Sequence, residues 1–240
     1  MRRVLLNYAD GAFTTAQKYN GWTGLETGGF DGVAMMGRQR IDAAFASRNR
    51  HVLDQPRGAG YWLWKPYFID RLLREDLKDG DILFYSDSGA HFVHSVDPLI
   101  EICRQRRDLP ILLFTLGDDH RNGVWTKRDC FHYMGLDRPD VVEAPQIMGS
   151  FILCERGPET MDFIAQWLRL SQDARLITDA PNECGLPNYP EFRGHRHDQS
   201  ILSLLGRRHR VTTIPDISQW GDGSRPPEIP RIMEHTRWRD

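Results

Sequence analysis

The feature that most constrains this chain is a short apolar run that ends at a carboxylate. Residues 82–85 are rich in strand formers, follow a turn-like stretch at residues 78–81, and are closed by Asp87. Ser88 and Gly89 come next and leave room beside the acid. In α/β folds, ligands bind at the carboxyl ends of buried strands. The run therefore predicts a buried strand whose terminal acid, Asp87, can meet a metal-bound diphosphate.

Strand-like and helix-like segments alternate along the rest of the chain. Apolar runs predict strands at residues 4–8, 82–85, 110–115, 147–154 and 211–214. Amphipathic patterns and start signals predict helices at residues 38–49, 66–77, 97–107, 157–168 and 198–205. The alternation predicts one α/β domain over residues 1–240, with a mostly parallel central sheet flanked by helices. Residues 116–146 and 178–197 are rich in Gly, Pro, Asn and Asp, and we expect long active-site loops there.

The composition excludes several classes of protein. A net charge of -2 argues against nucleic acid as the main partner, because such surfaces need a basic excess. The 4 cysteines form no CxxC pair, so we expect neither a zinc knuckle nor a disulfide framework, and Cys154 should pack as a small hydrophobe. The sequence has no apolar run long enough for a transmembrane segment or a signal peptide. We expect a cytoplasmic protein whose contact with a membrane, if its acceptor is lipid-linked, is peripheral.

Five strings carry a resemblance to a known family. They are GAGYWLWKP at residues 58–66, GDILFYSDSG at 80–89, WTKRD at 125–129, QIMGSF at 146–151 and HRHDQS at 195–200. In order and spacing they resemble bacterial glycosyltransferases of polysaccharide biosynthesis that have the GT-A, or nucleotide-diphospho-sugar transferase, fold. The resemblance implies a hexosyltransferase-like enzyme that moves a sugar from a nucleoside-diphosphate sugar to a glycan or lipid-linked glycan acceptor. It also implies assistance by a divalent cation, Mn²⁺ or Mg²⁺.

The resemblance also implies which residues bind the donor and the cation. The expected donor-binding residues are Tyr8, Ala9, Asp10, Gly60, Trp64, Lys65, Asp87, Ser88, Gly89 and Lys127. Asp87 and His235 are the expected metal ligands, and His91 is a nearer histidine in sequence. The usual Asp-x-Asp motif of this fold lacks its second acid here, because Gly89 occupies that position. One carboxylate can still hold a hard cation together with diphosphate oxygens and water.

Three residues are expected to serve the transfer step. Lys65 can neutralise charge that grows on the departing diphosphate. Asp198 is the candidate base for the acceptor hydroxyl if the reaction inverts the anomeric centre, and His197 is expected on the acceptor side. Each has a purely structural alternative. Lys65 can snorkel beside core tryptophans, and Asp198 can cap the helix that follows it.

Two other classes of function compete with sugar transfer. A sugar nucleotidyltransferase would place a Gly-rich, basic signature directly after the first strand, and residues 7–12, NYADGA, lack one. A glycan-binding module could use the 7 tryptophans as stacking platforms, but it would leave Asp87 and Lys65 without a purpose. A transferase should bind a nucleoside diphosphate more tightly in the presence of Mn²⁺ or Mg²⁺, whereas a glycan-binding module should ignore nucleotides.

Overall fold

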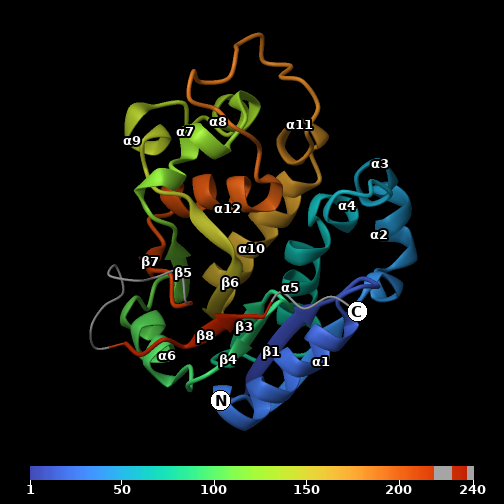
Figure 1. Ribbon diagram of the computed structural model, residues 1–240, viewed down its shortest axis with the longest axis vertical. Coiled ribbons are helices and arrows are strands. Elements are labelled where there is room, and N and C mark those ends of the chain that lie inside the picture. The colour runs from blue at the N-terminus through green and yellow to red at the C-terminus, as the bar shows by residue number, and fades with distance from the viewer. Residues whose placement is uncertain (219–228, 237–240) are drawn as a thin grey trace.

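The computed structural model describes residues 1–218 and 229–236, which form a central six-stranded sheet with helices on both faces (Figure 1). The strand order is β2-β1-β3-β6-β5-β7. The strands of this sheet are β1 (Arg3–Tyr8), β2 (Gly32–Met36), β3 (Ile82–Ser86), β5 (Ile111–Thr115), β6 (Ile147–Glu155) and β7 (Thr212–Pro215). β6 is antiparallel to β3 and to β5, whereas the other neighbouring pairs are parallel. The predicted α/β fold with a mostly parallel sheet is confirmed.

Apolar side chains cover both faces of the sheet. In β1, Val4 and Leu6 join the core that packs against the helices α5 (Trp64–Glu75), α10 (Pro158–Ser171) and α12 (His197–Arg208). Leu5 joins a second core on the opposite face, where α6 (Asp97–Gln105) packs. Successive residues of a strand point to opposite faces, so a strand buried on both sides reads as one continuous apolar run. For this reason the central strands could be predicted from the sequence.

A small antiparallel sheet extends the architecture near the carboxyl end of β3. It pairs β4 (Ala90–Phe92) with β8 (Met233–His235), so that Ala90 lies opposite His235. Two residues far apart in the sequence are thereby held at one edge of the central sheet. Neither strand was predicted, because each is only 3 residues long and has no apolar alternation of its own.

The first 50 residues depart most from the sequence expectations. α1 (Thr14–Thr23) and β2 were not predicted, and the π-helical turn η1 (Gly24–Gly28) joins them. The buried face of α1 consists of small and polar residues, so it lacks the apolar stripe that marks a helix in a sequence. The helix expected at residues 38–49 is broken into η2 (Arg38–Arg40) and α2 (Ala43–Arg48), because Asp42 caps a new start by accepting a hydrogen bond from the Phe45 amide.

The two segments expected to be loops differ in structure. The first contains the short helices η3 (Asp118–His120), α7 (Asn122–Trp125), α8 (Arg128–Tyr133) and α9 (Pro139–Val142), so the loop expectation there was wrong. Residues 178–196 contain neither helix nor strand, as expected. Asp129 of α8 anchors this second segment by accepting hydrogen bonds from the backbone amides of Glu183 and Cys184.

The remaining short helices lie beside these elements. They are α3 (Arg50–Leu53), α4 (Gly58–Tyr61) and α11 (Ala174–Ile177). Among the described residues, no helix is both long and apolar enough to cross a membrane. Cys154 is fully buried in β6 and packs as the small hydrophobe that was expected.

Candidate active site

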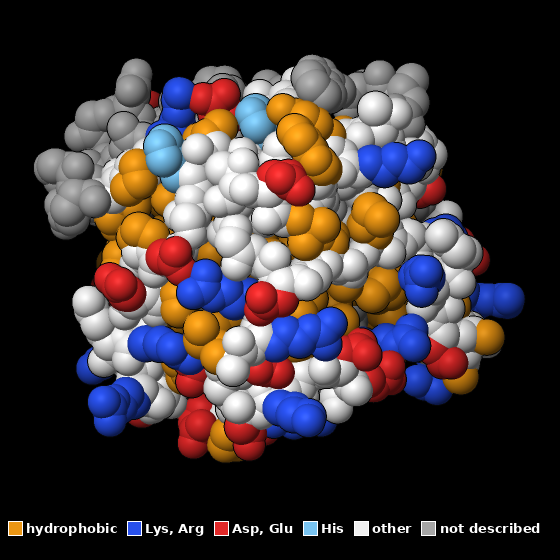
Figure 2. Space-filling model, turned by 90° about the horizontal axis from the view of Figure 1, so that it is seen from below, with side chains coloured by type: hydrophobic (Ala, Val, Ile, Leu, Met, Phe, Trp, Pro, Cys, Tyr) orange, Lys and Arg blue, Asp and Glu red, His pale blue; other side chains and the backbone are white. Residues whose placement is uncertain are grey.

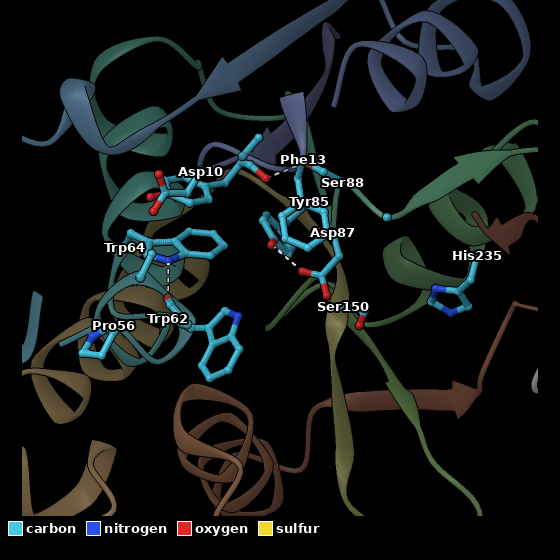
Figure 3. Close-up of a pocket in the computed structure, with 15 residues that line it drawn as sticks. Asp10, Phe13, Pro56, Trp62, Trp64, Tyr85, Asp87, Ser88, Ser150 and His235 are labelled. Atoms are coloured by element: carbon cyan, nitrogen blue, oxygen red, sulfur yellow. Dashed lines mark hydrogen bonds between the residues drawn. The ribbon is translucent and has the colours of Figure 1, made fainter. Parts of the chain in front are cut away.

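A cavity of about 820 Å³ opens at the carboxyl ends of β1 and β3 (Figure 3). Its volume lies in the range of small-molecule sites, which is roughly 300–1,000 Å³. Its described lining residues are Tyr8, Ala9, Asp10, Phe13, Pro56, Gly58, Ala59, Trp62, Trp64, Tyr85, Asp87, Ser88, Gly89, Ser150 and His235. The cavity therefore lies at the strand edge where the sequence predicted a ligand, and it includes the acid that ends the central strand.

The cavity is formed where two neighbouring strands end together. β1 and β3 are parallel and adjacent, so the residues that follow Tyr8 and Ser86 meet at the same edge of the sheet. The Ser88 hydroxyl donates a hydrogen bond to the Tyr8 carbonyl and ties the two strand ends together. Asp10 and Asp87 consequently line one cavity although they follow different strands. The sequence predicted each of these strand ends, and the sheet order brings them side by side.

Aromatic rings form one wall of the cavity. The rings of Tyr8 and Trp64 stack with centroids 3.7 Å apart and an interplanar angle of 12°. The Trp64 indole is held in place because its Nε1 donates to the Gly58 carbonyl at 3.0 Å. Burial, reinforced by the negative charge of Asp10, raises the pKa of Tyr8, so its ring stays neutral. This wall offers flat apolar surface of the kind that a nucleobase or a sugar ring can contact.

Five consecutive residues beside this wall have positive φ. The values are 58° for Gly58, 51° for Ala59, 100° for Gly60, 51° for Tyr61 and 59° for Trp62. A non-glycine residue in the left-handed region costs roughly 1–2 kcal/mol, so the turn is strained. Such strain concentrates at functional sites, where the surrounding structure holds it. In Figure 3 the turn places the Trp62 ring in the cavity below Trp64.

The two glycines of this turn are there for steric reasons as well. A Cβ on Gly58 would lie 2.3 Å from the Trp62 ring, and a Cβ on Gly60 would lie 2.6 Å from the Leu53 Cα. Gly60 is buried and does not line the cavity. Its observed part is to let the turn pack against α3, and its contact with a donor stays a prediction.

A buried ion pair next to Asp87 links two of the predicted residues, Lys65 and Asp198. The Lys65 Nζ lies 2.9 Å from Asp198 Oδ2, and the side chains of both residues are at most 4% exposed. The same Nζ donates to the Gly149 carbonyl at 2.9 Å and lies 3.7 Å from Asp87 Oδ1. Lys65 therefore joins the end of β3 to the start of α12. Neither Lys65 nor Asp198 lines the cavity, so Lys65 acts on a ligand there through Asp87 or at a distance.

The pKa values of this pair follow from burial and from the partner charge. Burial would lower the pKa of Lys65, but the carboxylates of Asp198 and Asp87 outweigh burial and raise it. Burial raises the pKa of Asp198 to about 6, although Lys65 acts in the opposite direction. At neutral pH the pair therefore consists of an ammonium and a carboxylate. Asp198 is not the N-cap of α12, because Arg196 holds that position.

His197 is buried beside the strained turn. Its Nδ1 lies 2.8 Å from the Ile177 carbonyl, and its ring contacts the rings of Tyr61 and Trp62 at centroid distances of 4.8 and 5.3 Å. Burial lowers the pKa of His197, so the imidazole is neutral. Its own φ is 53°, which adds a further strained residue to the same contact. The structure thus places His197 behind Trp62 and outside the cavity lining.

Lys127 does not reach the cavity. Its Nζ donates to the Ala180 carbonyl at 2.6 Å and lies 3.3 Å from Asp129, and its side chain is 4% exposed. The contribution of Lys127 to phosphate binding stays a prediction, and in this structure its ammonium faces these two partners. A buried lysine with a carboxylate partner instead helps to hold residues 178–196 against α8. Sequence reasoning missed this, because Ala180 lies 53 residues further along the chain.

The two candidate histidines are placed differently. His235 lines the cavity and its ring lies 5.8 Å from that of Phe151. His91 lies on β4 with its Nε2 3.8 Å from Glu234, and it is not among the cavity-lining residues. In the described part of the chain, no group of three or more His, Cys, Asp or Glu could hold a metal ion without other ligands. Asp87 and His235 both line the cavity, in which Figure 3 labels them, and Asp10 is a second lining carboxylate.

Seven lining residues are not among the site residues expected from the sequence. They are Phe13, Pro56, Gly58, Ala59, Trp62, Tyr85 and Ser150. Tyr85 could have been found, because it stands two residues before Asp87 in a strand and therefore points to the same side. Phe13 and Pro56 lie in irregular segments, for which no periodic signal exists.

Comparison with solved structures identifies the fold. The structure of apo mouse xyloside xylosyltransferase 1 is similar with a TM-score of 0.52 and 10% identity, covering 98% of this chain and 96% of that one. The apo structure of the WbbM bifunctional glycosyltransferase is similar with a TM-score of 0.55 and 11% identity, covering 98% of this chain. This chain spans 45% of the length of WbbM. The chain therefore has the GT-A-like fold of these glycosyltransferases, which confirms the fold that the sequence resemblance implied.

Comparison of the sequence with family models and with curated proteins finds no match. At 10% and 11% identity, the two similarities establish the fold alone.

Proposed function

We propose that this protein is a glycosyltransferase that moves a sugar from a nucleoside-diphosphate sugar to a glycan or lipid-linked glycan acceptor. The observation that carries the proposal is the cavity at the ends of β1 and β3, into which Asp87 projects beside an aromatic wall. The fold shared with two glycosyltransferases supports the same reaction class. One fold can host many functions, so the proposal depends on the chemistry of the cavity residues.

The charges around the cavity favour a donor that brings its own cation. Its described lining contains the carboxylates Asp10 and Asp87 but neither lysine nor arginine. A diphosphate placed there without a cation would face like charges and no basic partner. Asp87 and His235 supply one carboxylate and one imidazole, which suit Mn²⁺ or Mg²⁺ when phosphate oxygens and water complete the shell. A divalent cation so held would stabilise the negative charge on the departing diphosphate.

The remaining lining residues can bind and orient the donor. The stacked rings of Tyr8 and Trp64 offer a surface for the base, and the exposed carboxylate of Asp10 can accept hydrogen bonds from ribose hydroxyls. Trp62 can contact a sugar ring with the part of its indole that faces the cavity. Asp198 faces Lys65 and not the cavity, so we propose that it acts through Lys65 instead of directly on an acceptor hydroxyl.

The alternative functions fit the structure less well. A glycan-binding module would explain the aromatic wall but not the buried charges that support Asp87. On the face shown in Figure 2, basic and acidic side chains are interspersed, so that face has no continuous basic surface for nucleic acid. The hexosyl class of the donor, a place in polysaccharide biosynthesis and a cytoplasmic location are implied by the sequence resemblance alone and remain predictions.

Calorimetric titration with UDP and with GDP tests the proposal. The wild-type protein should bind one of the two nucleotides more tightly with Mn²⁺ than with EDTA. Asp87→Ala should reduce this metal-dependent gain by about tenfold or more, because a charge-assisted contact is removed. Asp119→Ala is the matched control, since Asp119 is an exposed aspartate of η3 outside the cavity lining. Equal Mn²⁺-dependent binding by wild type and Asp87→Ala would refute the assignment of Asp87.

Transfer itself should follow the same pattern. Donor sugars that bind should be hydrolysed slowly or transferred by wild type, and Asp87→Ala should abolish turnover while its thermal unfolding stays cooperative. A protein that ignores both nucleotides but binds oligosaccharides would instead be a glycan-binding module.

A further inference from the structure

The two oxygens of Asp87 have different surroundings. The Tyr85 hydroxyl donates to Oδ1 at 2.5 Å, drawn as a dashed line in Figure 3, and the Lys65 ammonium lies 3.7 Å from the same atom. Across the described residues, no side chain pairs with or hydrogen-bonds to Oδ2. The Asp87 side chain is 38% exposed, so the carboxylate reaches the cavity. One oxygen is therefore held by the protein while the other is available.

Tyr85 is suited to hold this oxygen permanently. It lies on β3, two residues before Asp87, which directly follows the strand, and the hydrogen bond between them shows that both side chains lie on the same side. Burial, together with the negative charge of Asp87, keeps the pKa of Tyr85 well above its usual range. The phenol therefore remains a donor at every physiological pH. A hydrogen bond from a neutral phenol to a carboxylate is short and strong, as the observed distance indicates.

Lys65 is held with equal precision. Its Nζ lies 5.1 Å from the centre of the Tyr85 ring and 5.8 Å from that of Trp64, so two aromatic rings flank the ammonium. An ammonium has three donors, and three acceptors surround this one: the Gly149 carbonyl, Asp198 and Asp87. Gly149 on β6 and Asp198 on α12 fix the position of the ammonium. The ammonium can then stabilise the position of Asp87 from behind.

We infer that Tyr85 and Lys65 are positioning residues that hold Oδ1 of Asp87, so that Asp87 presents Oδ2 alone to a cation or hydroxyl in the cavity. Asp198 belongs to the same arrangement, because it balances the charge of Lys65 at 2.9 Å. The inference refines the proposed function and rests on it for the role of Asp87. The arrangement itself is a property of this chain and can be tested without any ligand.

One consequence concerns the cations that the cavity can accept. A single carboxylate oxygen and one imidazole leave most of the coordination shell to phosphate and water, which suits Mg²⁺ and Mn²⁺. Ca²⁺ prefers six to eight oxygens, often with a bidentate carboxylate, which a carboxylate held through Oδ1 does not offer. In the nucleotide titration, Mn²⁺ should therefore improve binding more than Ca²⁺ at equal concentration.

Crystal structures test the positioning directly. Tyr85→Phe removes the hydroxyl and keeps the ring that flanks Lys65. In wild type we expect one Asp87 conformer with Oδ1 on Tyr85, and in Tyr85→Phe a rotated or multiply placed carboxylate. An unchanged Asp87 in Tyr85→Phe would overturn the inference, whether or not the protein binds nucleotides.

Binding measurements test what the positioning does. The nucleotide is UDP or GDP, whichever binds wild type. The factor by which Mn²⁺ increases its affinity should be about tenfold smaller in Tyr85→Phe than in wild type, whereas the affinity in EDTA should stay within about twofold. Equal losses with Mn²⁺ and with EDTA would reveal a merely structural role and overturn the inference. The control is Tyr67→Phe, because the Tyr67 hydroxyl accepts from the Asp42 amide at 2.9 Å outside the cavity and its loss should change neither affinity.

A second variant keeps the test independent of the tyrosine. Lys65→Met alone would leave Asp198 buried without its partner and can fail to fold. The double variant Lys65→Met/Asp198→Asn removes both charges together and should unfold cooperatively. It should show the same selective loss of the Mn²⁺-dependent gain. Retention of the full gain would overturn the part of the inference that concerns Lys65. If wild type binds neither nucleotide with Mn²⁺, the proposed function fails, and the crystal structures alone decide the positioning.

Discussion

The raised pKa of Asp198 predicts a specific pH dependence of stability. In the unfolded chain this carboxyl should titrate near its ordinary value of 3.8, whereas in the folded protein burial raises its pKa to about 6. Between these values the folded state holds a proton that the unfolded state has lost. Because stability falls with rising pH wherever the folded state binds more protons, this group makes the fold less stable as the pH rises from about 4 to about 6.

The size of the effect follows from the two pKa values. One pKa unit corresponds to 1.36 kcal/mol, so a rise from 3.8 to about 6 amounts to about 3 kcal/mol of unfolding free energy. The group is almost completely buried, so solvent screening does not reduce this figure much. Lys65 does not add to the change in this range, since its raised pKa keeps it protonated. The full stabilisation is present below about pH 4 and is lost once the pH passes about 6.

Urea denaturation of wild type and Asp198→Asn from pH 3 to pH 8 at constant ionic strength measures this term. Asparagine cannot ionise. From about pH 4 to about pH 6, the unfolding free energy of wild type should therefore fall by about 3 kcal/mol relative to that of Asp198→Asn. Asp119→Asn, at an exposed acid of η3, should show no comparable shift. A difference between wild type and Asp198→Asn that stays constant from pH 3 to pH 8 would show that Asp198 is not a buried acid with a raised pKa.

Two further predictions concern the scaffold of the site. Gly60→Ala should destabilise the fold by more than about 2 kcal/mol, because it adds left-handed strain and a Cβ 2.6 Å from the Leu53 Cα. Gly80 has a φ of 85° but no atom near its added Cβ, so Gly80→Ala should cost only about 1–2 kcal/mol. Thermal melts of both variants compare the two costs, and equal losses would contradict the steric argument. Asp129→Ala should cost about 3–5 kcal/mol, because it leaves the buried Lys127 without its partner, and limited proteolysis should then cut within residues 178–196. A variant as resistant as wild type would show that Asp129 does not anchor that segment.

Much of the fold could be predicted because burial leaves a periodic record in the sequence. The central strand at residues 82–86 and the helices that begin near Lys65 and Asp198 were found close to their observed positions. The direction of β6 could not be found, since a strand buried on both faces reads as the same apolar run whichever way it runs. α1 was missed because Asn20 and its buried neighbours make polar contacts in place of an apolar stripe.

The candidate site was predictable where residues follow a strand directly. Tyr8, Asp10, Asp87 and Ser88 were expected at the strand ends, and all four line the cavity. Lys127 was expected to contact a phosphate, and the structure places it in a buried ion pair with Asp129, outside the cavity lining. A basic residue in an apparent loop can as readily be buried in an ion pair as exposed to a ligand. Sequence patterns carry no information on which of the two occurs.

The sequence by itself determined which segments are buried and where the principal strands end, because hydrophobic periodicity and strand-terminal acids are local properties. Tertiary structure alone decided what each acid faces. Lys65 lies on α5, Asp87 directly follows β3, and Asp198 lies on α12. Only the packing of these elements brings both carboxylates within 4 Å of the Lys65 ammonium. The same packing places Tyr85 and Lys65 at one oxygen of Asp87 and neither of them at the other. Electrostatic contacts of this kind depend on distance in space, which the order of residues along the chain does not record.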